Sequence, residues 1–545
     1  MLIRKHRIRK VKCDEGWPAC SKCISTGRVC DGYGIWGGGG NTYQDRVDRD
    51  RPAVATQSRP TLRCMPVALS SRYTEPQEQG YLEWFFRRSV VKLPGIFSSP
   101  LWESVIPQAS STEPAVLHAI LALSAAHKNE VFRQPGPVLM QNKLGKHGQF
   151  ALHQYSIAIR TLKPHFLAQT RESSRITLIT CLIFIYLEFL LGNSDAGFLH
   201  INKGFKILEH FQFNVWLSND LTDQSIKEGF SRINLQSQLL GRMGHMGTFL
   251  VSKFELPTGK FETWTQSRKH LDLILSDTLN ITQCQIYSNE PGQIPSLNEL
   301  YQRQTYIRGQ LVAWRSLLSE SKTHLQVHTD IVASFAYRLL SIYHTMAKIM
   351  IETCLATTNE SVLDKHIEDF TSLVVQSVDL LNALRSASKR SATLPGEENS
   401  IFGSVADIAW IPPLYYTAIK CRNHRLRVHA AKLLRLNSHK EGLWDSYLVG
   451  RIAQEVIRFE EGDFYAGTFI DDNFPIDVSP SADDLILPSL PRHYLVNRVE
   501  IFMPKYFENR AQIACWRLKD DGEWVRILRE FNVVDDHSIP TKESR

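Results

Sequence analysis

Four cysteines lie within 18 residues near the N-terminus, at Cys13, Cys20, Cys23 and Cys30. Their spacing is C-x6-C-x2-C-x6-C. A C-x2-C pair lets two thiolates reach one metal ion from a tight turn, and cysteines six residues away can close a tetrahedral zinc site. The other six cysteines are far apart and mostly in apolar stretches, so the cluster predicts metal binding rather than a disulfide framework.

Four cations, Arg7, Arg9, Lys10 and Lys12, stand directly before the first of these cysteines. Beside a zinc site they would form a compact surface for phosphate, and a short helix there would bring Lys or Arg near guanine acceptors. The formal net charge is +7, and residues 1–36 hold eight Lys/Arg against three Asp/Glu. The excess is therefore concentrated at the N-terminus, which favours contact with double-stranded DNA.

These residues resemble the second part of a fungal Zn2Cys6 binuclear cluster. The segments that carry the resemblance are Arg9–Glu15, Pro18–Cys23, Gly27–Cys30 and Gly32–Tyr33. In that family two C-x2-C-x6-C halves, joined by a loop with a proline, hold two zinc ions. The resemblance implies that the four cysteines are the third to sixth ligands. It also implies that the basic run enters the major groove at a CGG-like half-site.

The first two cysteines of the family pattern are replaced, by Ile3 and His6. Ile3 cannot ligate zinc, and His6 offers one nitrogen, although a histidine among cations near the chain start is more often incidental. We therefore expect two zinc ions only if the cluster is complete, and one or none in the chain as written. Either the chain start is assigned too late and a C-x2-C lies upstream, or the cluster has been lost. The intact remainder of the motif favours the first.

Composition divides the chain into three regions. Residues 1–36 are the basic, cysteine-rich head, a partial zinc-cluster domain. Residues 37–75 contain four consecutive glycines and scattered Pro, Ser and Thr, which predicts a flexible linker. Residues 76–545 show helical periodicity with few alternating strand patterns, so we predict an all-α fold for this large region.

Two helices are predicted in particular. In residues 449–461 the apolar positions fit one face of a helix, and Arg451, Gln454, Glu455 and Arg458 take the opposite face, so this helix should bury one stripe only. Residues 176–191 are the most apolar stretch, but they are few and interrupted by Glu188. We therefore predict a buried helix there rather than a membrane span. The charged N-terminus shows no secretory signal.

Several segments of the large region resemble the fungal-specific transcription factor domain. They are Glu83–Phe86, Pro114–Lys128, Leu191–Asn193, His200–Gly204, Ile411–Tyr415, Lys420–Arg422, Ala431–Leu434 and Glu441–Asp445. The resemblance implies an all-helical regulatory domain that senses metabolites or partners. From the residues alone, Pro412 and Pro413 mark a helix entry or a kink, and Trp444 is a core anchor.

Residues 461–491 contain seven acids and no Lys or Arg, with aromatic residues interleaved. This composition occurs in activation segments. A long surface loop that bridges two helices is the favoured alternative.

Motifs of several enzyme classes are missing: no G-x-x-x-x-G-K-[ST], H-E-x-x-H or G-x-S-x-G occurs. His324 and His328 are interpreted as a surface pair. We therefore expect a nuclear regulator of RNA polymerase II transcription and not an enzyme. Its partners would be double-stranded DNA, a second copy of the chain in a homodimer, and a small-molecule effector or the transcription machinery, with no membrane. The alternative is an interaction protein that has lost its cluster and does not bind DNA.

Overall fold

The structure is a computed structural model. It describes residues 75–131, 145–168, 170–212, 220–242, 255–286, 296–356, 360–391, 406–436, 440–488, 490–503, 510–519 and 522–533. Backbone contacts divide the chain into two compact units, residues 1–63 with 388–399 and residues 64–387 with 400–545. Apart from residues 388–391, everything described below belongs to the second unit.

Helices dominate the second unit. The α-helices are α4 (Pro76–Trp84), α5 (Val90–Lys92), α6 (Ile106–Thr112), α7 (Pro114–Val131), α8 (Lys146–Ala168), α9 (Arg171–Leu191), α10 (Ser194–Gln212), α11 (Leu221–Leu239), α12 (Trp264–Ile286), α13 (Leu297–Glu320), α14 (Ile331–Thr353), α15 (Ile367–Ser391), α16 (Ile411–Lys420), α17 (His424–Arg435) and α18 (Ser446–Glu461). Short π-helical turns at Phe85–Ser89 and Leu101–Val105, and 3-10 turns at Glu360–His366, Asp483–Leu485 and Arg492–Tyr494, connect them.

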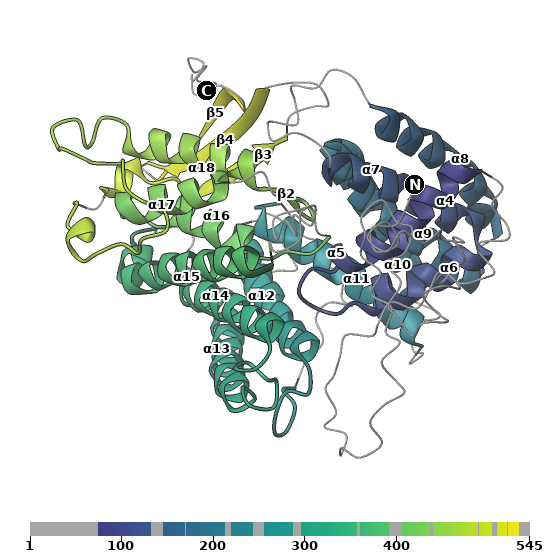
Figure 1. Ribbon diagram of the computed structural model, residues 1–545. Coiled ribbons are helices and arrows are strands. Elements are labelled where there is room, and N and C mark those ends of the chain that lie inside the picture. The colour runs from purple at the N-terminus through teal and green to yellow at the C-terminus, as the bar shows by residue number, and fades with distance from the viewer. Residues whose placement is uncertain are drawn as a thin grey trace, which may run out of the picture. The chain divides into compact units, whose positions relative to one another are not determined.

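The helices pack in three groups, which can be followed by label in Figure 1. One group is formed by α7, α8, α9 and α10, a second by α12, α13 and α14, and a third by α16, α17 and α18. Helix α11 contacts both α9 and α12, and α14 contacts α16. One continuous hydrophobic core therefore runs through all three groups.

Helix α9 is the central helix of the first group. The Thr170 side chain accepts a hydrogen bond from the backbone N–H of Ser173 at its start, and Gly192, with φ 82°, ends it in the left-handed conformation. Among the described helices, α9 alone is long and apolar enough to cross a membrane, and 83% of its most apolar stretch is buried within the protein. This confirms the predicted buried helix.

The third group carries the only sheets in the described residues. A two-stranded hairpin pairs β1 (Lys440–Glu441) with β2 (Trp444–Asp445). A three-stranded antiparallel sheet has the order β3-β4-β5, with β3 at Arg498–Phe502, β4 at Arg510–Leu518 and β5 at Trp524–Asn532. One face of this larger sheet packs against α18, where the guanidinium carbons of Arg517 and Arg529 lie 4.6 and 4.7 Å from the centre of the Phe459 ring.

This sheet changes one expectation about α18. The apolar positions of the helix are buried as predicted, but Arg451 and Glu455, predicted on the solvent face, are also buried, with 0% and 1% of their surface exposed. The reason is that the C-terminal sheet lies over this side, where Arg451 donates to the carbonyl of Asn532. The prediction that α18 buries a single stripe was therefore wrong.

The all-α fold class is confirmed, since helices form most of the described chain; the small C-terminal sheet is an addition that the sequence patterns did not reveal. Helix α16 begins at Ile411 with the two prolines in its first turn, as predicted. The boundaries proposed at residues 36 and 75 border or lie in the part of the chain that is not described, and they stay predictions.

Candidate functional site

The predicted zinc ligands and DNA-contacting residues lie outside the described residues. They are Cys13, Cys20, Cys23, Cys30 and His6, with Arg7, Arg9, Lys10 and Lys12. Within the described ranges no group of three or more His, Cys, Asp or Glu side chains is placed to hold a metal ion. The described cysteines are free thiols, and four of them are buried. Burial raises the pKa of the Cys421 thiol to about 12, which suits a core residue and not a metal ligand.

The clearest constellation in the described chain is built around the β1–β2 hairpin. The Glu441 carboxylate accepts hydrogen bonds from the backbone N–H groups of Ala409, Trp410 and Ile411, at 2.7, 3.1 and 3.1 Å. These donors open α16, whose first turn has prolines in place of further donors. A carboxylate from another part of the chain thus caps a helix N-terminus, where negative charge is favoured.

The next residues of the hairpin also have structural roles. Gly442 has φ 58°, and a Cβ there would lie 2.0 Å from Oε1 of Gln236 and 2.9 Å from the carbonyl oxygen of Ala406. Trp444 is 1% exposed, and its ring meets Tyr415 edge-on, which confirms the predicted core anchor. Glu441, Gly442 and Trp444 each contact another part of the fold, so the Glu441–Asp445 segment is a junction between α11, α16 and the hairpin.

Lys440 ties this hairpin to the first helical group. Its buried ammonium donates to the carbonyl oxygens of Phe189 and Leu190, at 3.3 and 3.2 Å. Both carbonyls belong to the last turn of α9, where a helix presents unpaired acceptors and partial negative charge. Two parts of the chain that are 250 residues apart therefore meet directly.

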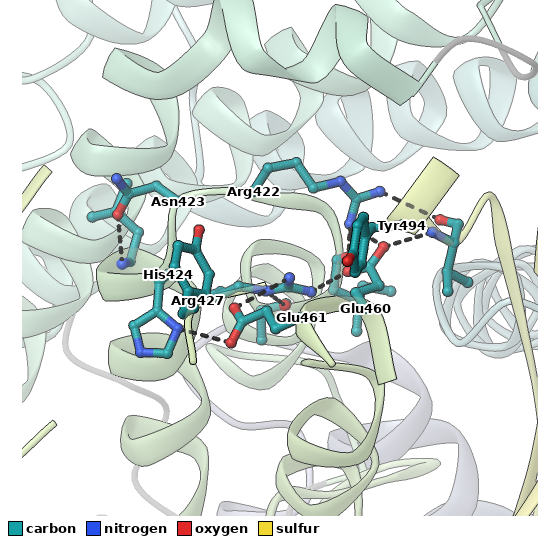
Figure 2. Close-up of polar contacts among 12 residues, drawn as sticks. Arg422, Asn423, His424, Arg427, Glu460, Glu461 and Tyr494 are labelled. Atoms are coloured by element: carbon teal, nitrogen blue, oxygen red, sulfur yellow. Dashed lines mark hydrogen bonds and ion pairs between the residues drawn. The ribbon is translucent and has the colours of Figure 1, made fainter. Parts of the chain in front are cut away.

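A second constellation is a fully buried ion-pair cluster, drawn in Figure 2. Arg422 approaches Glu460 at 2.8 Å, and Arg427 also pairs with Glu460. Oε1 of Glu460 also accepts a 2.6 Å hydrogen bond from the backbone N–H of Val496. Burial alone would raise the pKa of Glu460, but the two guanidinium groups and this N–H hold it below its usual value.

His424 lies beside this cluster and is held by two carboxylates. Its Nδ1 is 2.8 Å from Glu461, and its Nε2 is 3.0 Å from Asp472. A neutral imidazole can donate from one nitrogen only, so two carboxylate partners favour the doubly protonated ring. Burial lowers the pKa of His424, but the bonds to Asp472 and Glu461 outweigh burial and raise it to about 9.

The acidic segment of residues 461–491 packs along α17. Arg425 stacks on the Phe474 ring at 3.0 Å, and Lys432 donates to the carbonyl of Asp472. His429 Nε2 donates to the carbonyl of Ile476 at 2.9 Å. The segment joins α18 to the C-terminal sheet, so it is a surface loop as favoured, but it bridges a helix and a sheet and not two helices.

A small cavity lies between the first and second helical groups. Its lining includes Trp102, Tyr186, Arg232, Arg268 and Asp407, and it has space for about one water molecule. The Asp407 carboxylate bridges the two guanidinium groups, with Arg268 at 2.5 Å. The charged side chains that line the cavity are therefore paired with one another.

Sequence reasoning did not single out these clusters, apart from Trp444 and the segments that resemble the regulatory domain. The local sequence holds no signal for them, because Arg422 and Arg427 stand in a run rich in Lys, Arg, Asn and His that is typical of a solvent-exposed segment. Their partner Glu460 lies more than 30 positions away and could not be identified. His324 is exposed and 3.3 Å from Glu262, and His328 is exposed too, as predicted for a surface pair.

Residues 7–35 match the fungal Zn(2)-Cys(6) binuclear cluster domain. This confirms the resemblance of the head to that family, and the matched range contains all four predicted cysteines and the basic run. The match begins one residue after His6. The resemblance of the large region to the fungal-specific transcription factor domain stays a prediction.

The similar proteins are fungal transcription regulators. The aspercryptin biosynthesis cluster-specific transcription regulator atnN of Emericella nidulans is 22% identical over 543 residues, which span 84% of this chain and 86% of that protein. Transcription regulator lscL of Purpureocillium lilacinum is 27% identical over 215 residues, 39% of this chain and 49% of that protein. No solved structure matches this chain. The similarity supports a role in transcription regulation, and neither relative is named as an enzyme.

Proposed function

We propose that this chain is a nuclear transcription regulator that binds CGG-like half-sites of double-stranded DNA through its zinc-cluster head. The observation that carries the proposal is the match of residues 7–35 to the zinc-cluster domain, with the basic run inside it. Cys13, Cys20, Cys23 and Cys30 hold zinc, and Arg7, Arg9, Lys10 and Lys12 contact the duplex. Members of the family hold two zinc ions in the cluster, and cysteine thiolates are ligands that suit zinc.

The described body would serve as the regulatory domain. In this body the charged side chains of each buried cluster are paired with one another. Such pairing is typical of a structural scaffold and not of a substrate site. This supports a non-enzymatic role for the chain. An effector or the transcription machinery would act on this body.

Duplex binding measured against salt tests the proposal. Fluorescence anisotropy of the full chain, with a CGG-containing duplex, should give a dissociation constant that rises steeply with salt. Exchanging Arg9 and Lys10 for alanine should flatten the slope of log K against log salt by about 1–2, since each phosphate contact contributes close to one counterion. Arg88→Ala, on the exposed surface of the body, is the matched control and should change nothing.

A second candidate rests on Ile3 and His6, which stand where the family has cysteines. In this reading the head does not complete a cluster, and the chain regulates transcription through protein partners alone. It predicts weak binding that is equal for duplexes with and without CGG. Salt-dependent binding that prefers CGG would exclude it.

A further inference from the structure

Strand β5 is an edge of the C-terminal sheet, because the strand order is β3-β4-β5 (Figure 1). It pairs with β4 along all nine residues, Trp524–Asn532. On its other side no described strand pairs with it. An unpaired edge of this length presents a row of backbone N–H and C=O groups to which another strand can be added.

The two faces of β5 differ in environment. Phe531 is fully buried, and the Arg529 guanidinium lies over the Phe459 ring of α18, so this face is turned to the body. Arg526, Leu528 and Glu530 alternate with them on the other face. There Arg526 lies 5.7 Å from the Trp516 ring centre and 5.8 Å from that of Phe502.

We propose that β5 pairs with β5 of a second copy of this chain, antiparallel, about a two-fold axis at Leu528. The two sheets would then join into one sheet of six strands. In this register Leu528 faces its own copy, and Arg526 faces Glu530 of the partner subunit. Because the axis is two-fold, this opposite-charge pair occurs twice, on the same solvent-facing side.

This register is favoured over its neighbours by the sequence of the strand. It matches the seven residues from Val525 to Phe531, with Val525 opposite Phe531, and it leaves out Asn532, whose carbonyl already accepts a hydrogen bond from Arg451. A shift of one residue would turn one sheet over relative to the other. A shift of two, which keeps the faces matched, would put Arg526 opposite Leu528 or Asn532 and lose both charge pairs.

The two charged side chains have only loose partners within their own chain. Arg526 is 3.5 Å from Glu500, and Glu530 is 3.4 Å from Arg510, and in each pair the arginine side chain is more than one third exposed. Such contacts contribute little to stability. Both partners lie toward β4 and β3, so the outer side of β5 stays available for a second strand.

The interface belongs to the regulatory body, so the proposal does not rest on zinc or DNA binding by the head. A paired edge of about seven residues is smaller than a standard interface, so we expect self-association on the order of 1–10 μM. A two-fold body would present two heads, as dimeric regulators of paired half-sites do.

Charge reversal with rescue tests the pairing. Sedimentation equilibrium of the full chain, up to about 50 μM, should show a monomer–dimer equilibrium. Arg526→Glu and Glu530→Arg should each raise the dimer dissociation constant about tenfold or more, because like charges then face each other twice. The double variant R526E/E530R should restore dimerisation. Arg510→Glu, on β4, removes the intrachain partner of Glu530 but leaves the edge intact, and should dimerise like wild type.

Disulfide trapping tests the register. Leu528→Cys should form a disulfide-linked dimer under mild oxidation, because the residue faces its own copy across the axis. Glu530→Cys is the matched control: residues 530 of the two copies would be about 13 Å apart, too far to bridge. Wild type gives the background from the native cysteines.

Three outcomes would overturn the proposal. One is a wild-type chain that stays monomeric over this range. Another is a double variant that stays monomeric although its melting temperature equals that of wild type. The last is trapping of Glu530→Cys as efficient as that of Leu528→Cys. Duplex binding would be unaffected by these outcomes for a single half-site, so failure here is distinct from failure of the proposed function.

Discussion

Arg427 and Glu460 form an ion pair in which neither side chain has exposed surface (Figure 2). Arg422 shares the same carboxylate and also donates to the carbonyl of Val496, which follows the acidic segment. A buried pair of this kind adds little compared with a well-packed apolar core, but losing one partner leaves a charge without compensation. The cluster therefore joins α17, α18 and the residues that precede β3. It stabilises these contacts only while all three charged side chains are present.

Replacing Glu460 by Gln should be among the most destabilising single changes in the body. Arg422 and Arg427 would lose the carboxylate that they share, and Arg427 would keep only Glu461 at 3.6 Å, at a cost of about 3–5 kcal/mol. Thermal unfolding followed by circular dichroism measures the loss. Glu83→Gln is the control: its pair with Arg87 is more than half exposed on both sides, and a change within about 0.5 kcal/mol is expected. Equal effects of the two substitutions would contradict the role given to the cluster.

His424 should make stability fall as the pH rises above neutrality. Its pKa is raised to about 9 in the folded protein, against about 6.5 in an unfolded chain. The stabilisation is therefore complete below about pH 6.5 and is lost as the pH passes through 9, amounting to no more than about 3 kcal/mol. Melting temperatures of wild type and His424→Gln should differ most near pH 6 and converge by pH 9.5. A constant difference would show that the histidine acts by shape alone.

Gly442→Ala should destabilise the junction at the hairpin. The added Cβ would meet Gln236 and the Ala406 carbonyl in a backbone conformation that disfavours side chains, so a loss of about 2 kcal/mol or more is expected. Gly309→Ala is the matched control, because nothing lies within 4 Å of its Cβ position in α13 and alanine favours helix. It should leave stability unchanged or raise it by up to about 1 kcal/mol. Chemical denaturation of both variants gives the comparison.

The zinc content of the head should depend on its first two ligand positions. The chain as written should bind fewer than two zinc ions, and Ile3→Cys/His6→Cys, which restores C-x2-C-x6-C, should bring the number to two. Metal analysis by mass spectrometry after gel filtration gives the stoichiometry. Cys20→Ser should lower zinc content in either background, whereas Cys421→Ser, in the core, should not change it. Two zinc ions already present in the unaltered chain would contradict this reading of Ile3.

Local patterns predicted the helical body well. The apolar stretch of α9, the proline entry of α16 and the apolar stripe of α18 follow from periodicity and from the conformational limits of proline, which are properties of neighbouring residues. The burial of Trp444 also follows from its residue type, because large aromatic side chains contribute strongly to hydrophobic cores.

What the sequence could not supply is contact between distant segments. Glu441 caps a helix that begins 30 residues earlier, and Lys440 reaches a helix end 250 residues earlier. Arg451 and Glu455 were assigned to solvent because nothing in their own helix indicates that a sheet, formed some 50 residues later, covers them. Such pairings depend on the three-dimensional path of the chain, which periodicity does not contain.

Phe469 is 91% exposed at the tip of an acidic segment that is held on both sides. Tyr465 and Leu490 pack together before and after it, and Asp472 bonds to His424. The peptide bond after Phe469 would therefore be accessible to a protease that cuts after aromatic residues. Both new chain ends would stay attached to the body. The consequence is a nicked protein that migrates as one species on gel filtration and as two fragments once it is denatured.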